Sequence, residues 1–226
     1  MFERTVRVYV ETHQERRMSD QIISGLDGID RCWWPGDHED YIAYHDLEWG
    51  RPVTDEFRLF EKICLEGFQA GLSWLTILRK REAFRSSFEG FNPEIVANFK
   101  AKDVERLLQN KGIVRHRGKI ESVINNAQKF LELKKEFDSF STYIWAWESK
   151  KISHKSSNSI PASTEESTAL SKDLKKRGWS FVGPTTMYAF MQSVGLVNDH
   201  LLGCKFHNDV EEELHSFKRP IRKELL

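Results

Sequence analysis

The chain has 226 residues, of which 39% are hydrophobic and 30% charged, and this composition predicts one sizeable globular domain with or without tails. Because 34 Lys and Arg balance 34 Asp and Glu, any binding of a polyanion must come from a local patch. The chain has only three cysteines, which argues against a disulfide framework. It has no run of about 18 apolar residues, so no membrane span is expected. Residues 1–20 contain no apolar segment, so no secretory signal is expected either. We therefore expect a cytoplasmic protein.

The first half of the chain predicts a short tail followed by helices. Residues 1–28 mix charges with few large apolar side chains and are expected to form a flexible tail with at most a short strand or helix. Thr54 or Asp55 can cap a helix whose apolar residues recur at three and four from Phe57 onward, and Gly67 and Gly71 are expected to break it.

Further helices follow in the middle of the chain. Ser73 can cap one that presents residues 74–88 on a single apolar face, and Asn92-Pro93 combines an N-cap with proline at the first helical position. A short helix near 103–110 is expected to stop at Gly112, and another is expected to begin near Arg117.

The last third also predicts helices. Ser163-x-x-Glu166 predicts a capping box for a helix that ends at Gly178, and Gly183-Pro184 precedes a helix near 185–194. Residues 149–162 are expected to form a loop. No segment alternates long enough to build a sheet, so we predict an all-α domain over 29–207, followed by a charged tail over 208–226.

Two Cys/His pairs could bind a metal ion. Cys32 and His45 lie near the start of the domain, whereas His200 and Cys204 are four residues apart near its end. Two thiolates and two imidazoles form the tetrahedral set that structural zinc prefers. Spacing alone leaves open another possibility, in which the cysteines are simply buried, one histidine caps a helix and no ion is bound.

Glu66 lies on an apolar helical stripe with Leu59 and Ile63, and a buried carboxylate is costly unless it is paired or functional. A salt bridge to a nearby Arg or Lys is the alternative. Six aromatic residues flank these positions, and they could either belong to the core or hold a planar, electron-poor ring by stacking and cation–π attraction. They are Trp33, Trp34, Tyr41, Tyr44, Trp49 and Trp74.

Residues 110–120 predict a basic hairpin between two helices. Gly112 and Gly118 flank a stretch without acidic residues, and its cations are Lys111, Arg115, Arg117 and Lys119. Backbone amides at a helix N-terminus with cations nearby suit a DNA phosphate. The arrangement looks like a helix–hairpin–helix motif, although an ordinary solvated turn is the alternative.

Taken together, these residues resemble the 3-methyladenine DNA glycosylase I family of the helix–hairpin–helix superfamily. The resemblance runs from about Arg31 to Cys204. It is carried by the segments Arg31–Trp34, Tyr41–Gly50, Cys64–Trp74, Gly112–Ile120 and Gly195–His200.

The resemblance implies a role for each site. The family's zinc ligands fall on Cys32, His45, His200 and Cys204, and join the two ends of the domain. Its base-reading, catalytic acid falls on Glu66, and the loop that fills the gap left by the flipped nucleotide falls on Gly71-Leu72. Its pocket aromatics fall on Trp34, Tyr41, Tyr44, Trp49 and Trp74.

The implied activity is release of 3-methyladenine from double-stranded alkylated DNA by a monomeric, monofunctional enzyme, without strand cleavage. The residues before Arg31 and after Phe206 lie outside the family pattern, which leaves targeting and partners open. Two other readings compete: a glycosylase for another alkylated or deaminated base, and a DNA-binding module without catalysis. Glu66 and the aromatic set argue against the second of these.

Overall fold

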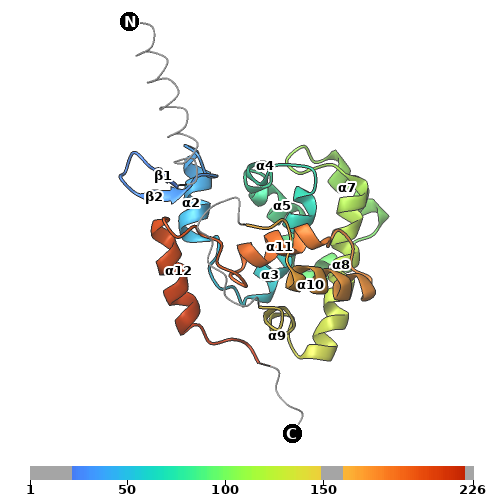
Figure 1. Cartoon of the computed structure of the whole chain (residues 1–226). Coiled ribbons are helices and arrows are strands. Elements are labelled where there is room, and N and C mark those ends of the chain that lie inside the picture. Colours follow the sequence, from blue (N-terminus) through green and yellow to red (C-terminus); the bar gives the residue numbers. More distant parts are fainter. Residues whose placement is uncertain (1–21, 149–159, 222–226) are drawn as a thin grey trace, which may run out of the picture.

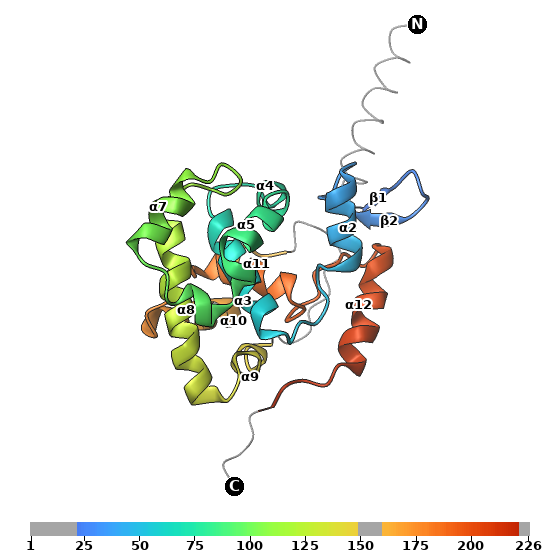
Figure 2. The same cartoon turned by 180° about the vertical axis from the view of Figure 1, so that it is seen from behind.

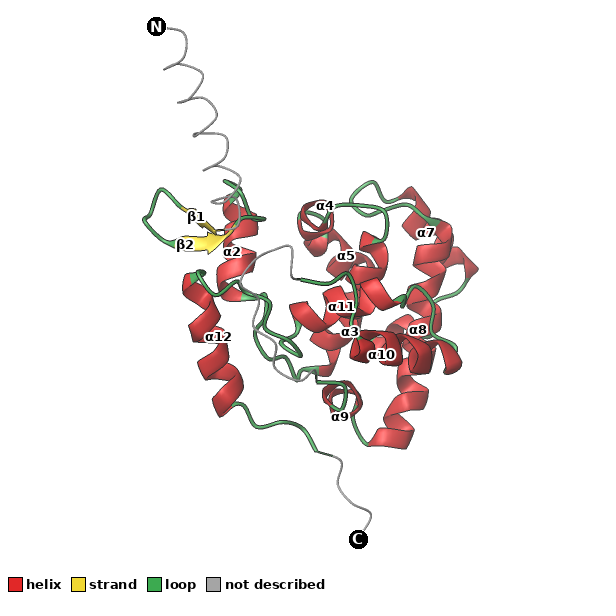
Figure 3. Cartoon of the chain, viewed as in Figure 1, coloured by secondary structure: helices red, strands yellow, loops and turns green. Residues whose placement is uncertain are grey.

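The computed structural model describes residues 22–148 and 160–221, and these form a mostly helical body (Figures 1 and 3). A two-stranded ribbon precedes the helices, with β1 (Ile22–Ser24) antiparallel to β2 (Asp30–Cys32). The N-terminal half continues with α2 (Glu39–Leu47), α3 (Glu56–Gln69), α4 (Trp74–Leu78), α5 (Arg81–Ser87), the 3₁₀ turn η1 (Glu89–Phe91), α6 (Pro93–Val96) and α7 (Ala101–Gln109). The C-terminal half contains α8 (Arg117–Phe137), α9 (Phe140–Trp145), α10 (Glu165–Lys176), α11 (Pro184–Ser193) and α12 (Lys205–Ser216).

Helix α3 passes through the centre of the molecule, where it packs against α4, α8, α9 and α11 (Figures 1 and 2). The side chain of Asp55 accepts a hydrogen bond from the amide of Arg58 and so caps the helix as expected. Gly67 does not break α3 and lies inside it. The chain leaves the helix at Ala70 and Gly71, and Gly71 has a φ of 79° that favours glycine.

The apolar face expected over residues 74–88 is divided between two helices. Ser73 caps α4 by accepting from Thr76, but the chain turns at Arg79 and Lys80 before α5 begins. The hairpin expected after residue 110 connects α7 and α8. In the later capping box Thr164, not Ser163, is the N-cap, and its partner is Ser167.

The packed structure extends at both ends beyond the limits expected from the sequence. Ile22 of β1 lies opposite Cys32, and α12 carries the fold past residue 207. Val210 and Leu214 of α12 are buried, and Phe217 packs on Trp145 with ring centroids 4.4 Å apart. The segment expected to be a charged tail therefore begins with a docked amphipathic helix.

Two remaining expectations concern loops and membranes. Residues 149–159 of the expected 149–162 loop lie outside the described residues, while 160–162 form no helix or strand. Within 22–148 and 160–221, no helix is long and apolar enough to cross a membrane.

Candidate active site and metal centre

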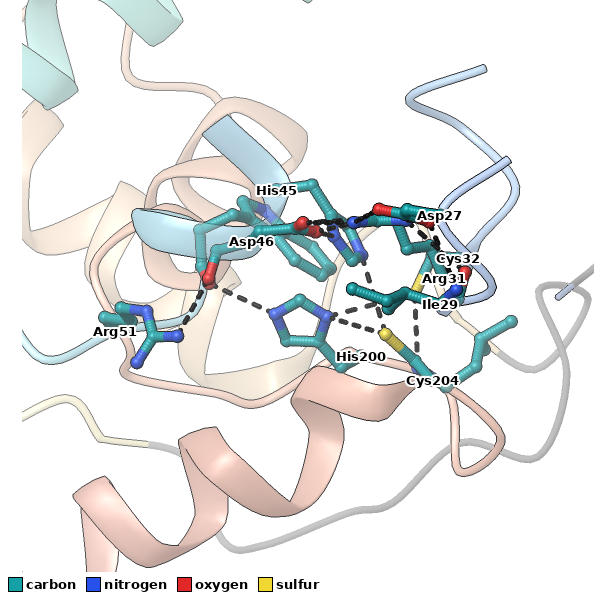
Figure 4. A network of polar contacts seen from close by, with 11 residues as sticks. Asp27, Ile29, Arg31, Cys32, His45, Asp46, Arg51, His200 and Cys204 are labelled. Atoms are coloured by element: carbon teal, nitrogen blue, oxygen red, sulfur yellow. Dashed lines mark hydrogen bonds and ion pairs between the residues drawn. The ribbon is translucent and has the colours of Figure 1, made fainter. Parts of the chain in front are cut away.

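Four side chains that could hold a metal ion come together from the two ends of the described chain (Figure 4). Cys32 ends β2 and His45 lies in α2, whereas His200 follows α11 and Cys204 is the N-cap of α12. All four residues are buried, and one possible ligand atom from each lies within 4.8 Å of the others. The predicted juxtaposition of the two Cys/His pairs is therefore present.

The spacing of these atoms fits a tetrahedral ion. Sulfur ligands at about 2.3 Å and nitrogen ligands at about 2.0–2.1 Å from Zn²⁺ would lie about 3.6 Å from one another. The Sγ atom of Cys204 lies 3.7 Å from Nε2 of His45 and 3.5 Å from Nδ1 of His200. The Sγ atom of Cys32 lies 3.9 Å from Nδ1 of His200. The donor set and its spacing thus suit a structural metal ion.

The outer nitrogen of each imidazole already has a partner. Nδ1 of His45 lies 2.7 Å from a carboxylate oxygen of Asp46, and Nε2 of His200 lies 3.2 Å from the carbonyl oxygen of Trp49. Arg31 in turn donates to Asp46 (Figure 4). Such contacts orient metal-binding imidazoles and leave Nε2 of His45 and Nδ1 of His200 facing the sulfurs. Burial also lowers the pKa of His200, which favours the neutral, metal-binding ring.

A cavity of about 380 Å³ lies beside this cluster. All five aromatic residues assigned to the pocket from the resemblance line it. Glu66 and Gln69 of α3 and Ala189 and Gln192 of α11 complete its walls, with Trp33 and Ile160. The lining residues are Trp33, Trp34, Tyr41, Tyr44, Trp49, Glu66, Gln69, Trp74, Ile160, Ala189 and Gln192.

Gln69, Ile160, Ala189 and Gln192 were not singled out from the sequence. Gln69 follows Glu66 by three residues on α3, so helical spacing could have indicated that both face one cavity. Ile160 and the two α11 residues reach the cavity through tertiary packing, for which the sequence offers no local signal.

The aromatic rings support one another around the cavity. The Trp34 ring lies 4.8 Å from Tyr41 and 5.1 Å from Trp49, between centroids, and Tyr44 lies 5.4 Å from Trp74. The cavity therefore offers π-faces and ring edges from several directions, as a planar ligand requires.

Glu66 is the acid of this cavity. Its side chain is only 4% exposed, and its Oε2 atom has no hydrogen-bond partner within the described part of the chain. Burial raises the pKa of Glu66 to about 8, against a partial lowering by the ammonium of Lys62. Within residues 22–148 and 160–221 the salt bridge considered as an alternative does not form, and the nearby Lys62 pairs with Glu48 at 2.7 Å instead.

Three further polar groups accompany this carboxyl. The indole Nε1 of Trp74 is also buried without a hydrogen-bond partner in the described residues. Burial and the nearby Glu66 raise the pKa of Tyr41 to about 12 and shift that of Tyr44 in the same direction, so both phenols keep their protons. The site thus holds an unsatisfied acceptor and neutral donors, an arrangement expected where a ligand supplies the missing partners.

The metal cluster forms part of the support behind the aromatic wall. The ring of His45 lies 5.0 Å from that of Trp34, and the ring of His200 lies 4.7 Å from that of Trp49. The two imidazoles therefore contact two tryptophans of the cavity although neither imidazole is among its lining residues, and the two sites share one structural support.

A second, smaller hollow of about 200 Å³ connects Glu66 and Gln69 with the loop after α3. This hollow is also lined by Gly71, Leu72 and the start of α11. Leu72 is 41% exposed although it is a large apolar side chain. The position fits an apolar wedge beside the entrance to the pocket.

The hairpin is held rigidly and presents exposed cations. Nζ of Lys80 donates to the carbonyls of Lys111 and Gly112, at 3.3 and 3.2 Å. A Cβ atom on Gly112 would lie 2.9 Å from that of Ala83, so glycine is required there. The side chains of Lys111 and Arg115 are exposed, and Arg117, also exposed, pairs with Glu105.

Lys119 does not occupy the exposed position expected of a phosphate contact. Its residue is only 7% exposed, and its ammonium donates to the carbonyls of Phe68 and Ala70, at 2.8 and 2.5 Å. These carbonyls end α3, where unpaired acceptors and the helix dipole favour a cation. Lys119 therefore joins the start of α8 to the loop that carries Leu72.

A buried acid in an aromatic cavity, an apolar wedge at its entrance and a basic hairpin nearby are the parts needed to hold a nucleotide outside a duplex. They define the class as a DNA glycosylase, in agreement with the following similarities. A sequence model of the family described as methyladenine glycosylase matches residues 34–208. The chain therefore belongs to the methyladenine glycosylase family.

Named relatives agree with this assignment. The DNA-3-methyladenine glycosylase of Haemophilus influenzae is 50% identical over 181 residues, which cover 77% of this chain and 96% of the relative. DNA-3-methyladenine glycosylase 1 of Escherichia coli strain K12 is 50% identical over 183 residues, covering 78% and 96%.

Solved structures agree as well. A crystal structure of 3-methyladenine DNA glycosylase I superimposes with a TM-score of 0.75 and 52% identity, and covers 77% of this chain and 98% of that one. A variant of 3-methyladenine DNA glycosylase I in complex with 3-methyladenine gives a TM-score of 0.73 at 38% identity, with 75% and 92% covered.

Proposed function

We infer that this chain removes 3-methyladenine from alkylated DNA by hydrolysing the N-glycosidic bond. The single observation that carries this inference is Glu66, a buried carboxyl with an unpartnered oxygen in a cavity walled by aromatic rings. The names of the relatives identify the nucleobase that is released, since chains 50% identical to this one are DNA-3-methyladenine glycosylases.

The cavity selects a cationic purine by two effects. The aromatic faces attract positive charge, and a carboxylate in a poorly solvated site pairs with a cation much more strongly than it does in water. Binding of the cation offsets the desolvation that otherwise keeps Glu66 protonated, so the acid ionises as the base enters. Neutral adenine provides no such compensation.

Hydrolysis then requires little help from the protein. Alkylation leaves the purine positively charged, so the base departs as neutral 3-methyladenine when water adds to C1′ of the sugar and loses a proton. No lysine is among the described residues that line the cavity, and the nearby ammonium of Lys119 is bonded to two carbonyls. We therefore propose base release without strand cleavage.

Access to the base requires a duplex to be opened. We propose that the hairpin holds the phosphate backbone through Lys111, Arg115 and the amides near Gly112 and Gly118, with Arg117 nearby. Gly71 allows the turn that exposes Leu72, which occupies the gap in the stack. The partner is double-stranded DNA containing alkylated adenine, and one chain supplies every part of the site.

We propose that Cys32, His45, His200 and Cys204 bind one Zn²⁺. The donor types, their burial and their spacing support this choice. The ion would act as a structural clasp and supply no chemistry to the bond cleavage, because none of its four ligands is among the residues that line the cavity. Three buried cysteines without a disulfide support work in the reducing cytoplasm, and we propose that the chain works there as a monomer.

The test is base release from methylated duplex DNA, followed by strand analysis. We expect free 3-methyladenine and an abasic site in an uncut strand. Release of a different modified base in place of 3-methyladenine would show another lesion specificity. DNA binding without release of any base would identify a binding module and contradict the proposal.

A further inference from the structure

Phe181, in the connection between α10 and α11, combines a strained backbone with an exposed ring. Its φ is 57°, in the left-handed region, and its residue is 37% exposed. Phe91 has the same φ but is fully buried, so core packing compensates for its conformation. No comparable burial compensates at Phe181, and non-glycine residues held in this way cluster at functional sites.

Hydrogen bonds fix the backbone on both sides of Phe181. The side-chain amide of Asn126 donates to the carbonyl of Ser180 and accepts from its N–H, both at 3.0 Å. The hydroxyl of Ser171 donates to the carbonyl of Val182 at 2.6 Å. Asn126 and Ser171 are buried, so the surrounding structure fixes the strained backbone conformation of Phe181 and keeps its ring at the surface.

The ring lies over the beginning of α8. A Cβ atom on Gly118 would lie 3.9 Å from Cζ of Phe181, and the His116 ring meets the Phe181 ring edge-on at 6.2 Å between centroids. Phe181 also approaches α3 closely, because a Cβ atom added to Gly67 would lie 3.3 Å from the Cβ atom of Phe181. Gly67 directly follows Glu66. Phe181 therefore spans the space between the acid-bearing helix and the hairpin.

This position lies next to the proposed phosphate site. Within the described residues, the amides of Arg117 and Gly118 have no acceptor, as is usual in the first turn of a helix. Because the Phe181 ring lies next to Gly118, the deoxyribose beside a DNA phosphate bound there could pack on this ring. The sugar presents C–H groups, which pack well on an aromatic face and require neither a particular base nor a charge.

We propose that Phe181 is a DNA-positioning residue that packs against a deoxyribose beside the phosphate held at the start of α8. The proposal rests on the DNA-binding role inferred above. It adds an uncharged contact to the anchoring surface, beside Gly118 and His116 at the α8 end of the hairpin. Its energy depends on apolar contact, so it is independent of sequence and nearly independent of salt.

The test compares Phe181→Ala and Phe181→Gly with Phe57→Ala. Phe57 is a suitable control because it is 41% exposed and lies ten residues before Gly67 on α3, about 15 Å away. We expect both Phe181 variants to weaken the binding of undamaged and abasic duplexes by about three- to tenfold. The slope of affinity against salt and the affinity for free 3-methyladenine stay unchanged, and Phe57→Ala binds like the parent chain.

The glycine variant separates contact from folding. Glycine adopts a φ of 57° without strain, so Phe181→Gly keeps or raises the melting temperature if the ring serves DNA. Duplex affinity equal to the parent's in both variants would overturn the proposal. So would a parallel loss of melting temperature, duplex binding and free-base binding, which would identify a packing residue. Failure of the parent chain to release 3-methyladenine would refute the proposed function and leave the duplex-binding comparison still informative.

Discussion

Replacing Glu66 by Gln is expected to abolish most activity and at the same time stabilise the fold. The carboxyl is buried with an unpartnered oxygen, and burial raises its pKa from 4.5 to about 8. Between these two pH values the unfolded chain carries an ionised Glu66 while the folded chain keeps the proton. Stability conferred by this group therefore falls as pH rises from 4.5 to about 8.

The magnitude follows from the size of the shift. At about 1.36 kcal/mol per pKa unit, Glu66 costs the fold less than about 1 kcal/mol at pH 5, about 3 kcal/mol at pH 7 and about 4–5 kcal/mol at pH 9. Glutamine has a similar size and does not titrate. The gain in the free energy of unfolding of Glu66→Gln should therefore grow with pH over this range and level off near pH 9.

Activity is expected to change in the opposite direction. The variant loses a charged acceptor that contributes about 1.5–3 kcal/mol per hydrogen bond, so base release should fall by about ten- to a hundredfold or more. Urea unfolding at pH 5, 7 and 9, together with 3-methyladenine release from the same samples, measures both effects.

Glu61 provides a matched control on the same helix. It is also buried, but it accepts from Arg85 at 2.9 Å and pairs with Arg58. Glu61→Gln should destabilise the fold, because it weakens the pairing of these cations. Our reasoning is wrong if Glu66→Gln is less stable than the parent at pH 9, if its gain is independent of pH, or if its excision rate is undiminished.

Three further predictions concern pH, anchoring and the metal. The kcat/KM of the parent chain should rise with pH up to about 8 and then level off, because the free enzyme must ionise Glu66 to bind a cationic base; a flat profile over pH 6–9 would contradict this. Lys111→Ala should reduce the slope of log affinity against log salt concentration by about 0.9. Lys119→Met should leave that slope unchanged but lower kcat, because the loop that carries Leu72 is displaced. Equal slopes in the two variants would refute the assignment of Lys111 to phosphate and Lys119 to the loop. Metal analysis should find one zinc per chain, and Cys204→Ala should lose the metal and several degrees of melting temperature; an unchanged melting temperature would argue against a clasp.

Local signals in the sequence predicted much of the fold. Asp55 and Ser73 cap helices where expected, and the spacing around Glu66 placed the acid on a buried face. These features depend on neighbouring residues only. Helix α12 shows the limit, because its charged sequence suggested an appendage, whereas His207, Val210 and Leu214 on one face are buried against the body.

In the functional site, too, some features depend on neighbouring residues and others on tertiary packing. The resemblance assigned the acid and the aromatic residues that line the cavity, but it could not give the direction of a long side chain. Lys119 belongs to a basic stretch in the sequence, yet its ammonium turns inward because the carbonyls at the end of α3 lie within reach. That choice depends on how α3 and α8 cross, which no short stretch of sequence encodes.

The contact between the imidazoles of His45 and His200 and the pocket tryptophans has a consequence for local unfolding. Cys32, Leu201 and Cys204 form a small apolar cluster separate from the main core, and the rings of His45 and His200 connect this cluster to Trp34 and Trp49. One wall of the pocket therefore belongs to the clasp, whereas Glu66 belongs to the central core. Segments of this kind open as cooperative units below the global unfolding free energy. Amides of β2 and of residues 201–204 should consequently exchange with solvent before those of α3, and each such opening would loosen the base pocket while the acid stays in place.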